Sequence, residues 1–324
     1  MKTSTSQQID IFPEIKVSQN AKPFIKWAGG KSKLIPQFAP FFPKELTEGD
    51  IENYYEPFLG GGAVFFHIVQ NYTIKNAFLF DINDDLILMY KVVQRDVFTL
   101  IEEIIKLRNN YSNLSESEQE NFFYSLRKEV NQQIQYFDYN TYDDAWVIRA
   151  AKLIFLNKTC FNGLFRQNSK GEFNVPFGRY KNPQIIDEDN LIIISNLLQS
   201  ATIEKRGFAE LEKSLMPKAF VYLDPPYRPI SKTASFTSYS KFDFNEEAQI
   251  SLAEMLKRLQ KNKSVKIMLS NSDPHNEDMS DNFFQNNYGQ HGFLIDKVYA
   301  SRMINCDSSK RGKIPELIIR NYEV

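Results

Sequence analysis

Histidine and cysteine are scarce in this chain of 324 residues, which has three histidines and two cysteines. The histidines are widely separated, and Cys160 and Cys306 fit neither a metal-binding spacing nor a disulfide framework. This pattern argues against a zinc centre of the kind that nucleobase deaminases use, and we expect no bound metal.

Long apolar runs and a strong net charge are also missing. The sequence has no secretory segment and no apolar run of membrane-spanning length, so we expect an intracellular protein. A formal net charge of −1 gives little overall attraction to nucleic acid. Residues 157–182 differ from the rest, because they hold one acid, Glu172, among cations and aromatics (Lys158, Phe161, Phe165, Arg166, Lys170, Phe173, Phe177, Arg179, Tyr180, Lys181). Such a stretch suits a DNA-binding face, although solvated basic loops are common.

The tetrapeptide Asp224-Pro225-Pro226-Tyr227 directly follows an apolar run, Ala219–Leu223, that is typical of a buried strand. Open α/β sheets bind ligands at the carboxyl ends of their parallel strands. The Asp224 carboxylate and the Pro225 carbonyl can accept the two N–H bonds of an exocyclic base amine, and the Tyr227 ring can stack on the base. The prolines remove competing donors and fix φ. Alone, such a motif is more often just a rigid turn.

A glycine turn near the start of the chain indicates a cofactor site. Gly60, Gly61 and Gly62 follow Tyr55-Glu56-Pro57-Phe58 and lead into the apolar run Val64–Val69. A strand, glycine turn and helix in this order present backbone N–H groups to a polar cofactor, but the spacing departs from the nicotinamide pattern G-x-G-x-x-G. Asp81 ends the next apolar run about twenty residues later, an offset typical of an acid that binds ribose hydroxyls.

Six sequence blocks follow one another in a characteristic order: Lys26-Trp27-Ala28-Gly29-Gly30-Lys31, Glu56–Gly62, Asp81-Ile82-Asn83, Phe161-Asn162-Gly163-Leu164-Phe165-Arg166, Gly171–Tyr180 and Asp224–Tyr227. Together they resemble the Dam-type DNA adenine-N6 methyltransferases of the D12 class, which use S-adenosylmethionine and modify GATC. The resemblance extends from about Lys22 to the C-terminus. It implies a cytoplasmic enzyme at the nucleoid of a bacterium, archaeon or phage-infected cell.

The resemblance implies transfer of a methyl group from S-adenosylmethionine to N6 of an adenine that is flipped out of duplex DNA, with Asp224, Pro225, Pro226 and Tyr227 as the catalytic residues. It assigns the cofactor to Trp27, Lys31, Phe58, Gly60, Gly62, Asp81 and Asp224. From the residues alone, Trp27 is equally compatible with a core aromatic and Lys31 with a solvated cation. The segment Arg206–Ala209 lacks an acid that the family often carries there, so we expect only stacking, by Phe208.

For DNA, the resemblance assigns Lys26, Phe161, Asn162, Leu164, Arg166, Pro176 and Arg179, and it places Lys26, Leu164, Arg166 and Pro176 at base edges. The fork of Arg166 suits guanine O6 and N7, and the apolar Leu164 and Pro176 suit a thymine methyl. Phe161 would insert where the adenine leaves the stack, and Arg179 would contact a phosphate. Phe161 and Leu164 are also compatible with an ordinary hairpin core. Two loops are expected near the DNA: Ser235, Phe236, Thr237 and Tyr239 over the flipped base, and Ser301–Lys313 along the duplex.

We predict an α/β fold, a Rossmann-like methyltransferase with a mostly parallel, helix-covered sheet. Residues 1–21 are expected to be a flexible extension, 22–84 and 188–324 a catalytic domain, and 85–187 an inserted, mainly helical target-recognition domain that carries a β-hairpin. Helical patterns follow Asp84 and cover Glu118–Val130 and Ala145–Leu156, and Asn245 is expected to cap a further helix. The apolar run from Leu191 is expected to resume the sheet.

Other functions fit parts of the pattern. An RNA adenine or a protein amide would use the same acceptors, but such a substrate leaves the aromatic, basic hairpin unexplained. A catalytically inactive DNA-binding module conflicts with the intact Asp224-Pro225-Pro226-Tyr227. We expect the enzyme to protect DNA in a restriction–modification system, with a cognate restriction endonuclease that acts separately; a solitary regulatory methyltransferase is the alternative.

Overall fold

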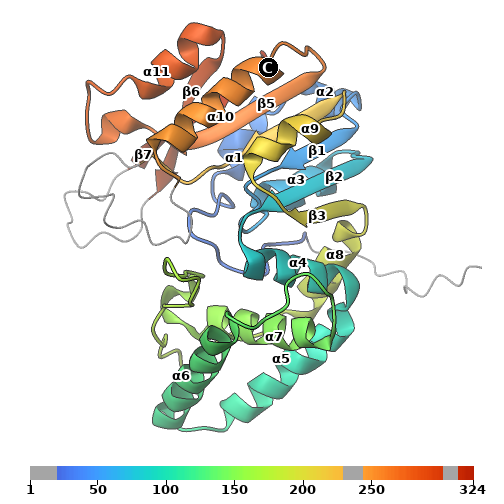
Figure 1. Ribbon diagram of the computed structural model, residues 1–324, viewed down its shortest axis with the longest axis vertical. Coiled ribbons are helices and arrows are strands. Elements are labelled where there is room, and N and C mark those ends of the chain that lie inside the picture. Colours follow the sequence, from blue (N-terminus) through green and yellow to red (C-terminus); the bar gives the residue numbers. More distant parts are fainter. Residues whose placement is uncertain (1–19, 229–243, 302–312) are drawn as a thin grey trace, which may run out of the picture.

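A computed structural model describes residues 20–228, 244–301 and 313–324 and shows a seven-stranded sheet with helices on both faces (Figure 1). The order across the sheet is β3-β2-β1-β4-β5-β7-β6. The strands are β1 (Asn53–Glu56), β2 (Asn76–Asp81), β3 (Ala201–Lys205), β4 (Ala219–Leu223), β5 (Val265–Ser272), β6 (Leu294–Ser301) and β7 (Lys313–Arg320).

The sheet is mostly parallel, as predicted. Strands β3, β2, β1, β4 and β5 pair in parallel, whereas β7 runs antiparallel between β5 and β6. From β1 the chain first adds β2 and β3 on one side and then β4 and β5 on the other. This reversal creates a switch point at the carboxyl ends of β1 and β4, where an open sheet of this type binds its ligands.

Both faces of β4 are buried, and its residues alternate between two cores. Phe220 and Tyr222 pack into one core, while Val221 and Leu223 pack into the other. Helices against the first core are α1 (Ile35–Phe38), α2 (Lys44–Glu48), α3 (Ala63–Asn71), α4 (Asp84–Arg95) and α8 (Glu188–Leu198); those against the second are α9 (Leu211–Ser214), α10 (Glu246–Leu259) and α11 (Phe283–Asn287). A strand covered on both sides requires an unbroken apolar run, which is why β4 was predictable from the sequence.

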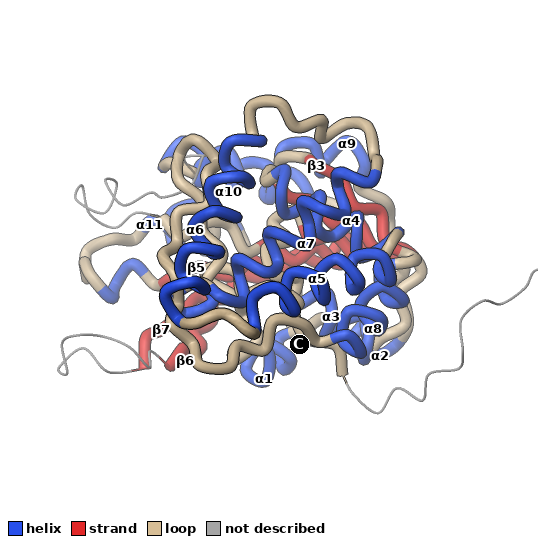
Figure 2. The backbone as a smooth tube through the Cα atoms, turned by 90° about the horizontal axis from the view of Figure 1, so that it is seen from below, coloured by secondary structure: helices blue, strands red, loops and turns tan. Residues whose placement is uncertain are grey.

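The inserted helices form a lobe below the sheet in Figure 1, and Figure 2 shows them from beneath. They are α5 (Val97–Ser112), α6 (Glu116–Gln133) and α7 (Asp144–Thr159), which together with α4 confirm the helical patterns read from the sequence. Helix α4 packs against β2, β3 and α8 and also against α5 and α7 of the lobe. One apolar core therefore continues from the sheet into the lobe, and the division of the chain at residues 85 and 187 stays a prediction.

The expectation that the sheet resumes at Leu191 is wrong, because Leu191 lies in α8 and β3 begins only at Ala201. The β-branched residues from Ile192 to Ile194 imitate a strand, but the preceding acids mark a helix start. The Asp187 side chain accepts a hydrogen bond from the Asn190 N–H and caps α8. The predicted cap at Asn245 is confirmed, since its side chain accepts from the Ala248 N–H.

Several predicted features lie outside the described residues: residues 1–19 of the expected extension, the loop around Ser235–Tyr239, and residues 302–312. The fold already includes Ala21, which is buried and donates its N–H to Gln70 Oε1 at 2.6 Å. In the part of the chain that the structure describes, no helix combines the length and the apolar character needed to cross a bilayer.

Candidate active site

Asp224 lies directly after β4, at the switch point of the sheet, and two side chains hold its carboxylate. Lys31 Nζ is 2.7 Å from both Oδ1 and Oδ2, and the Ser270 hydroxyl on neighbouring β5 donates to Oδ1 at 3.1 Å. The Lys31 side chain is only 4% exposed, so the reading of Lys31 as a solvated cation is wrong. A carboxylate offers about four lone-pair positions. The two contacts with Lys31 and the hydrogen bond from Ser270 use three of these positions. Among these contacts, one lone-pair position on Oδ2 is still open to a further donor.

The rest of the Asp-Pro-Pro-Tyr turn is fixed from two sides. Gln249, fully buried in α10, donates its Nε2 to the Pro226 carbonyl at 2.9 Å. Lys31 Nζ lies 4.9 Å from the centre of the Tyr227 ring, within the range of a cation–π contact. The tyrosine ring is therefore placed beside the Asp224 carboxylate while 38% of the residue stays exposed.

Two buried acids that the sequence analysis did not assign adjoin this turn. Glu56, at the end of β1, accepts a hydrogen bond from Tyr54 at 2.6 Å, and burial raises its pKa to about 8, with the negative charges of Asp224 and Asp81 acting in the same direction. Glu316 on β7 is also buried, and burial raises its pKa although Lys31 and a hydrogen bond with Tyr227 oppose the shift. Their only sequence signal is a carboxylate inside or next to an apolar strand.

The glycine turn and Asp81 form a second part of the site. Asp81 ends β2, and its carboxylate accepts the Gly60 N–H at 3.1 Å and the Asn83 N–H at 3.0 Å. Burial raises the pKa of Asp81 to about 6. Gly60 and Gly62 have φ of +48° and +66°, in the left-handed region that favours glycine. A Cβ added at Gly60 would lie 2.9 Å from Trp27 Cδ1, so the turn approaches the indole as closely as glycine allows.

Two groups of aromatic rings include residues of this part of the site. Phe58 stacks on Phe208 with centroids 5.9 Å apart, and Phe244 meets both rings edge-on. Trp27 stacks on Phe165 with centroids 5.0 Å apart and planes inclined by 18°. A carboxylate that can accept hydroxyl hydrogens, a close backbone turn and flat apolar rings are the groups that a ribose and an adenine require, so these residues fit a nucleoside cofactor.

The segment from Phe161 to Tyr180 folds back on itself as predicted, with antiparallel contacts instead of regular strands. The Phe161 N–H donates to the Pro176 carbonyl at 2.8 Å, and Gln167 pairs with Phe173 in an antiparallel bridge. Phe161 is 56% exposed, which excludes an ordinary core role for it. Leu164 is partly buried and Pro176 is exposed.

The first sequence block is docked onto this hairpin. Lys26 donates its Nζ to the Asn162 carbonyl at 2.6 Å, and its own carbonyl accepts the Phe165 N–H at 2.8 Å. The Arg166 Nε donates to Asn174 Oδ1 at 2.8 Å. Arg179 forms ion pairs with Glu116 and Glu120 on α6, at 3.0 and 2.8 Å. A phosphate would therefore compete with two carboxylates for Arg179.

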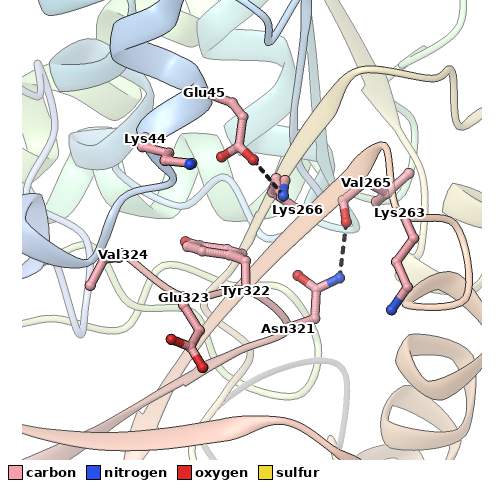
Figure 3. Close-up of a pocket in the computed structure, with 9 residues that line it drawn as sticks. All are labelled: Lys44, Glu45, Lys263, Val265, Lys266, Asn321, Tyr322, Glu323 and Val324. Carbon is pink, nitrogen blue, oxygen red and sulfur yellow. Dashed lines mark hydrogen bonds and ion pairs between the residues drawn. The ribbon is translucent and has the colours of Figure 1, made fainter.

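A hollow lies near the amino ends of β4 and β5, away from Asp224 (Figure 3). It is lined by Lys44, Glu45, Lys263, Val265, Lys266, Asn321, Tyr322, Glu323 and Val324. Val265 begins β5 and pairs with Ala219 at the start of β4. The hollow is thus a strand length, roughly 16 Å, from Asp224, and it contains none of the motif residues.

The sheet order, the glycine turn and the acid–proline turn at the switch point together define a Rossmann-like methyltransferase. Residues 27–303 match the family described as D12 class N6 adenine-specific DNA methyltransferase, and the chain belongs to this family. The family resemblance read from the sequence is therefore confirmed. The chain is an adenine-N6 DNA methyltransferase, and its methyl donor is S-adenosylmethionine.

Relatives of near full length support this assignment. The chain is 49% identical over 302 residues to the Type II methyltransferase M.MjaIII of Methanocaldococcus jannaschii, covering 93% of this chain and 99% of the relative. It is 35% identical to the Type II methyltransferase M1.LlaDCHI of Lactococcus lactis subsp. cremoris, covering 94% and 96%. It is 32% identical to a DNA adenine methylase of Haemophilus influenzae, covering 94% and 95%. Among the described residues, no group of three or more His, Cys, Asp and Glu side chains is arranged to hold a metal ion.

Proposed function

We propose that this enzyme methylates the adenine of GATC in duplex DNA, after the base has flipped out of the helix into the space beside Asp224 and Tyr227. The observation that carries the proposal is the constrained Asp224 carboxylate at the switch point, with an acceptor position left on Oδ2. An adenine inside the duplex cannot reach such a recessed group, and extruding it costs a few kcal/mol.

In the proposed mechanism the chain localises the lone pair of N6. Asp224 Oδ2 accepts one N6–H and the Pro225 carbonyl accepts the other, which draws the nitrogen towards tetrahedral geometry. Tyr227 stacks on the purine ring, and its position is set by the Lys31 ammonium. Bound S-adenosylmethionine supplies an electrophilic methyl group on its sulfonium sulfur. Catalysis then depends on alignment and local electrostatics more than on a strong general base.

The proposed cofactor contacts surround the glycine turn. Asp81 accepts the ribose hydroxyls, Gly60 and Gly62 let the backbone approach, and Trp27 and Phe58 present aromatic faces. Lys31 contributes through the Asp224 carboxylate, which it holds at 2.7 Å.

For DNA, we propose that the exposed hairpin enters the duplex. Phe161 takes the place of the flipped adenine, and Arg166 reads a guanine, since its bond to Asn174 fixes the plane of the guanidinium as bidentate recognition requires. Leu164 and Pro176 contact a thymine methyl. Lys26 and Asn162 support the hairpin tip, where they are joined by a 2.6 Å hydrogen bond. Arg179 gives up its ion pairs with Glu116 and Glu120 and binds a phosphate instead.

The proposed role is protection of DNA beside a separate restriction endonuclease. The support comes from two relatives named Type II methyltransferases, including the one with 49% identity. A solitary regulatory enzyme is the second candidate, because other relatives of near full length are named DNA adenine methylases.

The test is a digestion assay on plasmid from methylation-deficient cells that express the protein. We expect GATC sites to resist an endonuclease that N6-methyladenine blocks, and cells expressing Asp224→Ala to yield fully cleavable plasmid. Cleavable GATC sites, together with N6-methyladenine elsewhere in the plasmid, would refute the sequence assignment. Methylation of RNA or protein with no modified DNA would refute the duplex substrate.

A further inference from the structure

Gln167, the residue after Arg166, connects the hairpin to two other parts of the molecule through both ends of its amide. Its Oε1 accepts a hydrogen bond from Asn83 Nδ2 at 2.7 Å, and its Nε2 donates to Asp85 Oδ2 at 2.7 Å. Asn83 and Asp85 flank the start of α4, more than eighty residues earlier in the sequence. The side chain is therefore an internal bridge of the enzyme, although its neighbour Arg166 is the residue proposed to read a guanine.

Asn83 connects this bridge to the cofactor side. Its N–H donates to Asp81 Oδ1 at 3.0 Å, while its own Oδ1 accepts the Leu86 N–H at 3.0 Å and caps α4. The same residue thus orients the acid proposed to bind ribose and the amide that holds Gln167. A continuous series of hydrogen bonds leads from Asp81 through Asn83 to Gln167.

Asp85 makes the other end of the bridge rigid. Its carboxylate accepts Arg149 Nε at 2.7 Å and Nη2 at 3.1 Å, and the Tyr139 hydroxyl at 2.7 Å. Both Asp85 and Arg149 are almost completely buried. A buried ion pair with several hydrogen bonds has little freedom to move, because separating the two charges would leave both of them buried without their partner. Gln167 is therefore held between a rigid anchor and a group that touches the cofactor acid.

We propose that Gln167 is a positioning residue that couples cofactor binding at Asp81 to DNA recognition at Arg166; the proposal rests on the function proposed above. Successive side chains of an extended segment point to opposite sides, so fixing Gln167 inwards directs Arg166 outwards. When ribose hydroxyls bind Asp81, the Asn83 peptide and its amide lose freedom, so the Asn83 end of the bridge is fixed as firmly as the Asp85 end before DNA arrives. DNA then binds with less entropy to lose, and by reciprocity DNA strengthens cofactor binding by the same factor.

The experiment measures that factor without turnover. A fluorescein-labelled GATC duplex is titrated by anisotropy with the full-length protein, without and with saturating S-adenosylhomocysteine, and the ratio of the two Kd values is the coupling factor. We expect the wild-type protein to bind DNA about fivefold or more tightly with the cofactor product, the lower end of typical allosteric coupling. A wild-type ratio of one overturns the proposal.

Two variants test the bridge itself. Gln167→Met removes both hydrogen bonds at similar volume, and Asn83→Ser keeps a capping oxygen for α4 but loses the bond to Gln167. We expect both to bring the ratio to about one while S-adenosylhomocysteine alone binds within about twofold of wild type. The matched control is Gln94→Met, since Gln94 bridges the far end of α4 to the Leu198 and Ala201 carbonyls with two similar bonds.

The control should keep the wild-type ratio. If both bridge variants fold and keep the wild-type ratio, or if Gln94→Met loses it equally, Gln167 has only a general structural role and the proposal fails. The same titration on a scrambled duplex separates the two proposals. Equal affinity for both duplexes contradicts GATC recognition, whereas affinity that ignores the cofactor contradicts coupling.

Discussion

The buried carboxyl of Glu56 leads to a prediction about how stability depends on pH. Glu56 lies at the end of β1, is 3% exposed, and accepts the Tyr54 hydroxyl at 2.6 Å. Burial raises its pKa to about 8 from the ordinary value of 4.5. The folded protein therefore keeps a proton on Glu56 at neutral pH, whereas the unfolded chain has already released it.

The sign of the effect follows from proton linkage. Between about pH 4.5 and pH 8 the folded state binds more protons than the unfolded state, so the free energy of unfolding falls as pH rises. The stabilising contribution is complete below pH 4.5 and is lost as the pH passes through about 8. Each pKa unit corresponds to about 1.4 kcal/mol, so the full shift corresponds to a loss of about 5 kcal/mol, and the interval from pH 5 to pH 8 to about 4 kcal/mol.

Glu56→Gln removes this titration and keeps an oxygen that can accept the Tyr54 hydroxyl. We measure the free energy of unfolding by urea denaturation at pH 5, 6, 7 and 8. The value for the variant minus the value for wild type is expected to increase steadily as the pH rises. The control is Glu52→Gln, because Lys218 and Lys75 lower the pKa of Glu52 and move its titration below this interval. Parallel curves for wild type and Glu56→Gln would refute a protonated Glu56.

Three further predictions concern the proposed site. S-adenosylhomocysteine binding, followed by calorimetry, should weaken about tenfold per pH unit below about pH 6, because protonation removes the Asp81 acceptor; an equal slope in Asp81→Asn would contradict this. Gly60→Ala forces a Cβ to 2.9 Å from the Trp27 ring, so it should weaken cofactor binding at least tenfold, whereas Gly49→Ala, with positive φ but open space, should not. Arg179→Ala should lower the slope of log K for DNA binding against log salt concentration by about one and leave the sequence preference unchanged. An unchanged slope with an altered sequence preference would exclude a phosphate contact.

The parts of the fold that could be predicted from the sequence are those encoded by neighbouring residues. The run Ala219–Leu223 indicates β4 because both of its faces are covered, and Asn245 indicates a helix start because its cap acts within four residues. The prediction of a strand at Leu191 was wrong because it also relied on neighbouring residues alone. A short apolar run does not distinguish a buried helix from a strand.

Contacts between distant segments could not be predicted in this way. Ser270 reaches Asp224 from 46 residues further along the chain, only because β5 lies beside β4. Gln249 holds the Pro226 carbonyl only because α10 covers that face of the sheet. Neither residue type is unusual in its local sequence, so each gains its place at the site from the tertiary arrangement, Ser270 through the strand order and Gln249 through the packing of α10.

The strand order also explains why the insertion between β2 and β3, which we propose reads DNA, starts close to the acceptor turn. The chain leaves β2 at Asp81, on the carboxyl edge of the sheet, and every element up to α8 is inserted there before β3 begins. Strand β2 is separated from β4 only by β1, so this exit lies two strand spacings, roughly 10 Å, from the end of β4 at Asp224. An insertion at the amino edge would start a strand length further away. Topology therefore brings the acid proposed to bind the cofactor, the hairpin and the acceptor turn together, and the hydrogen bond between Asn83 and Gln167 joins the first two.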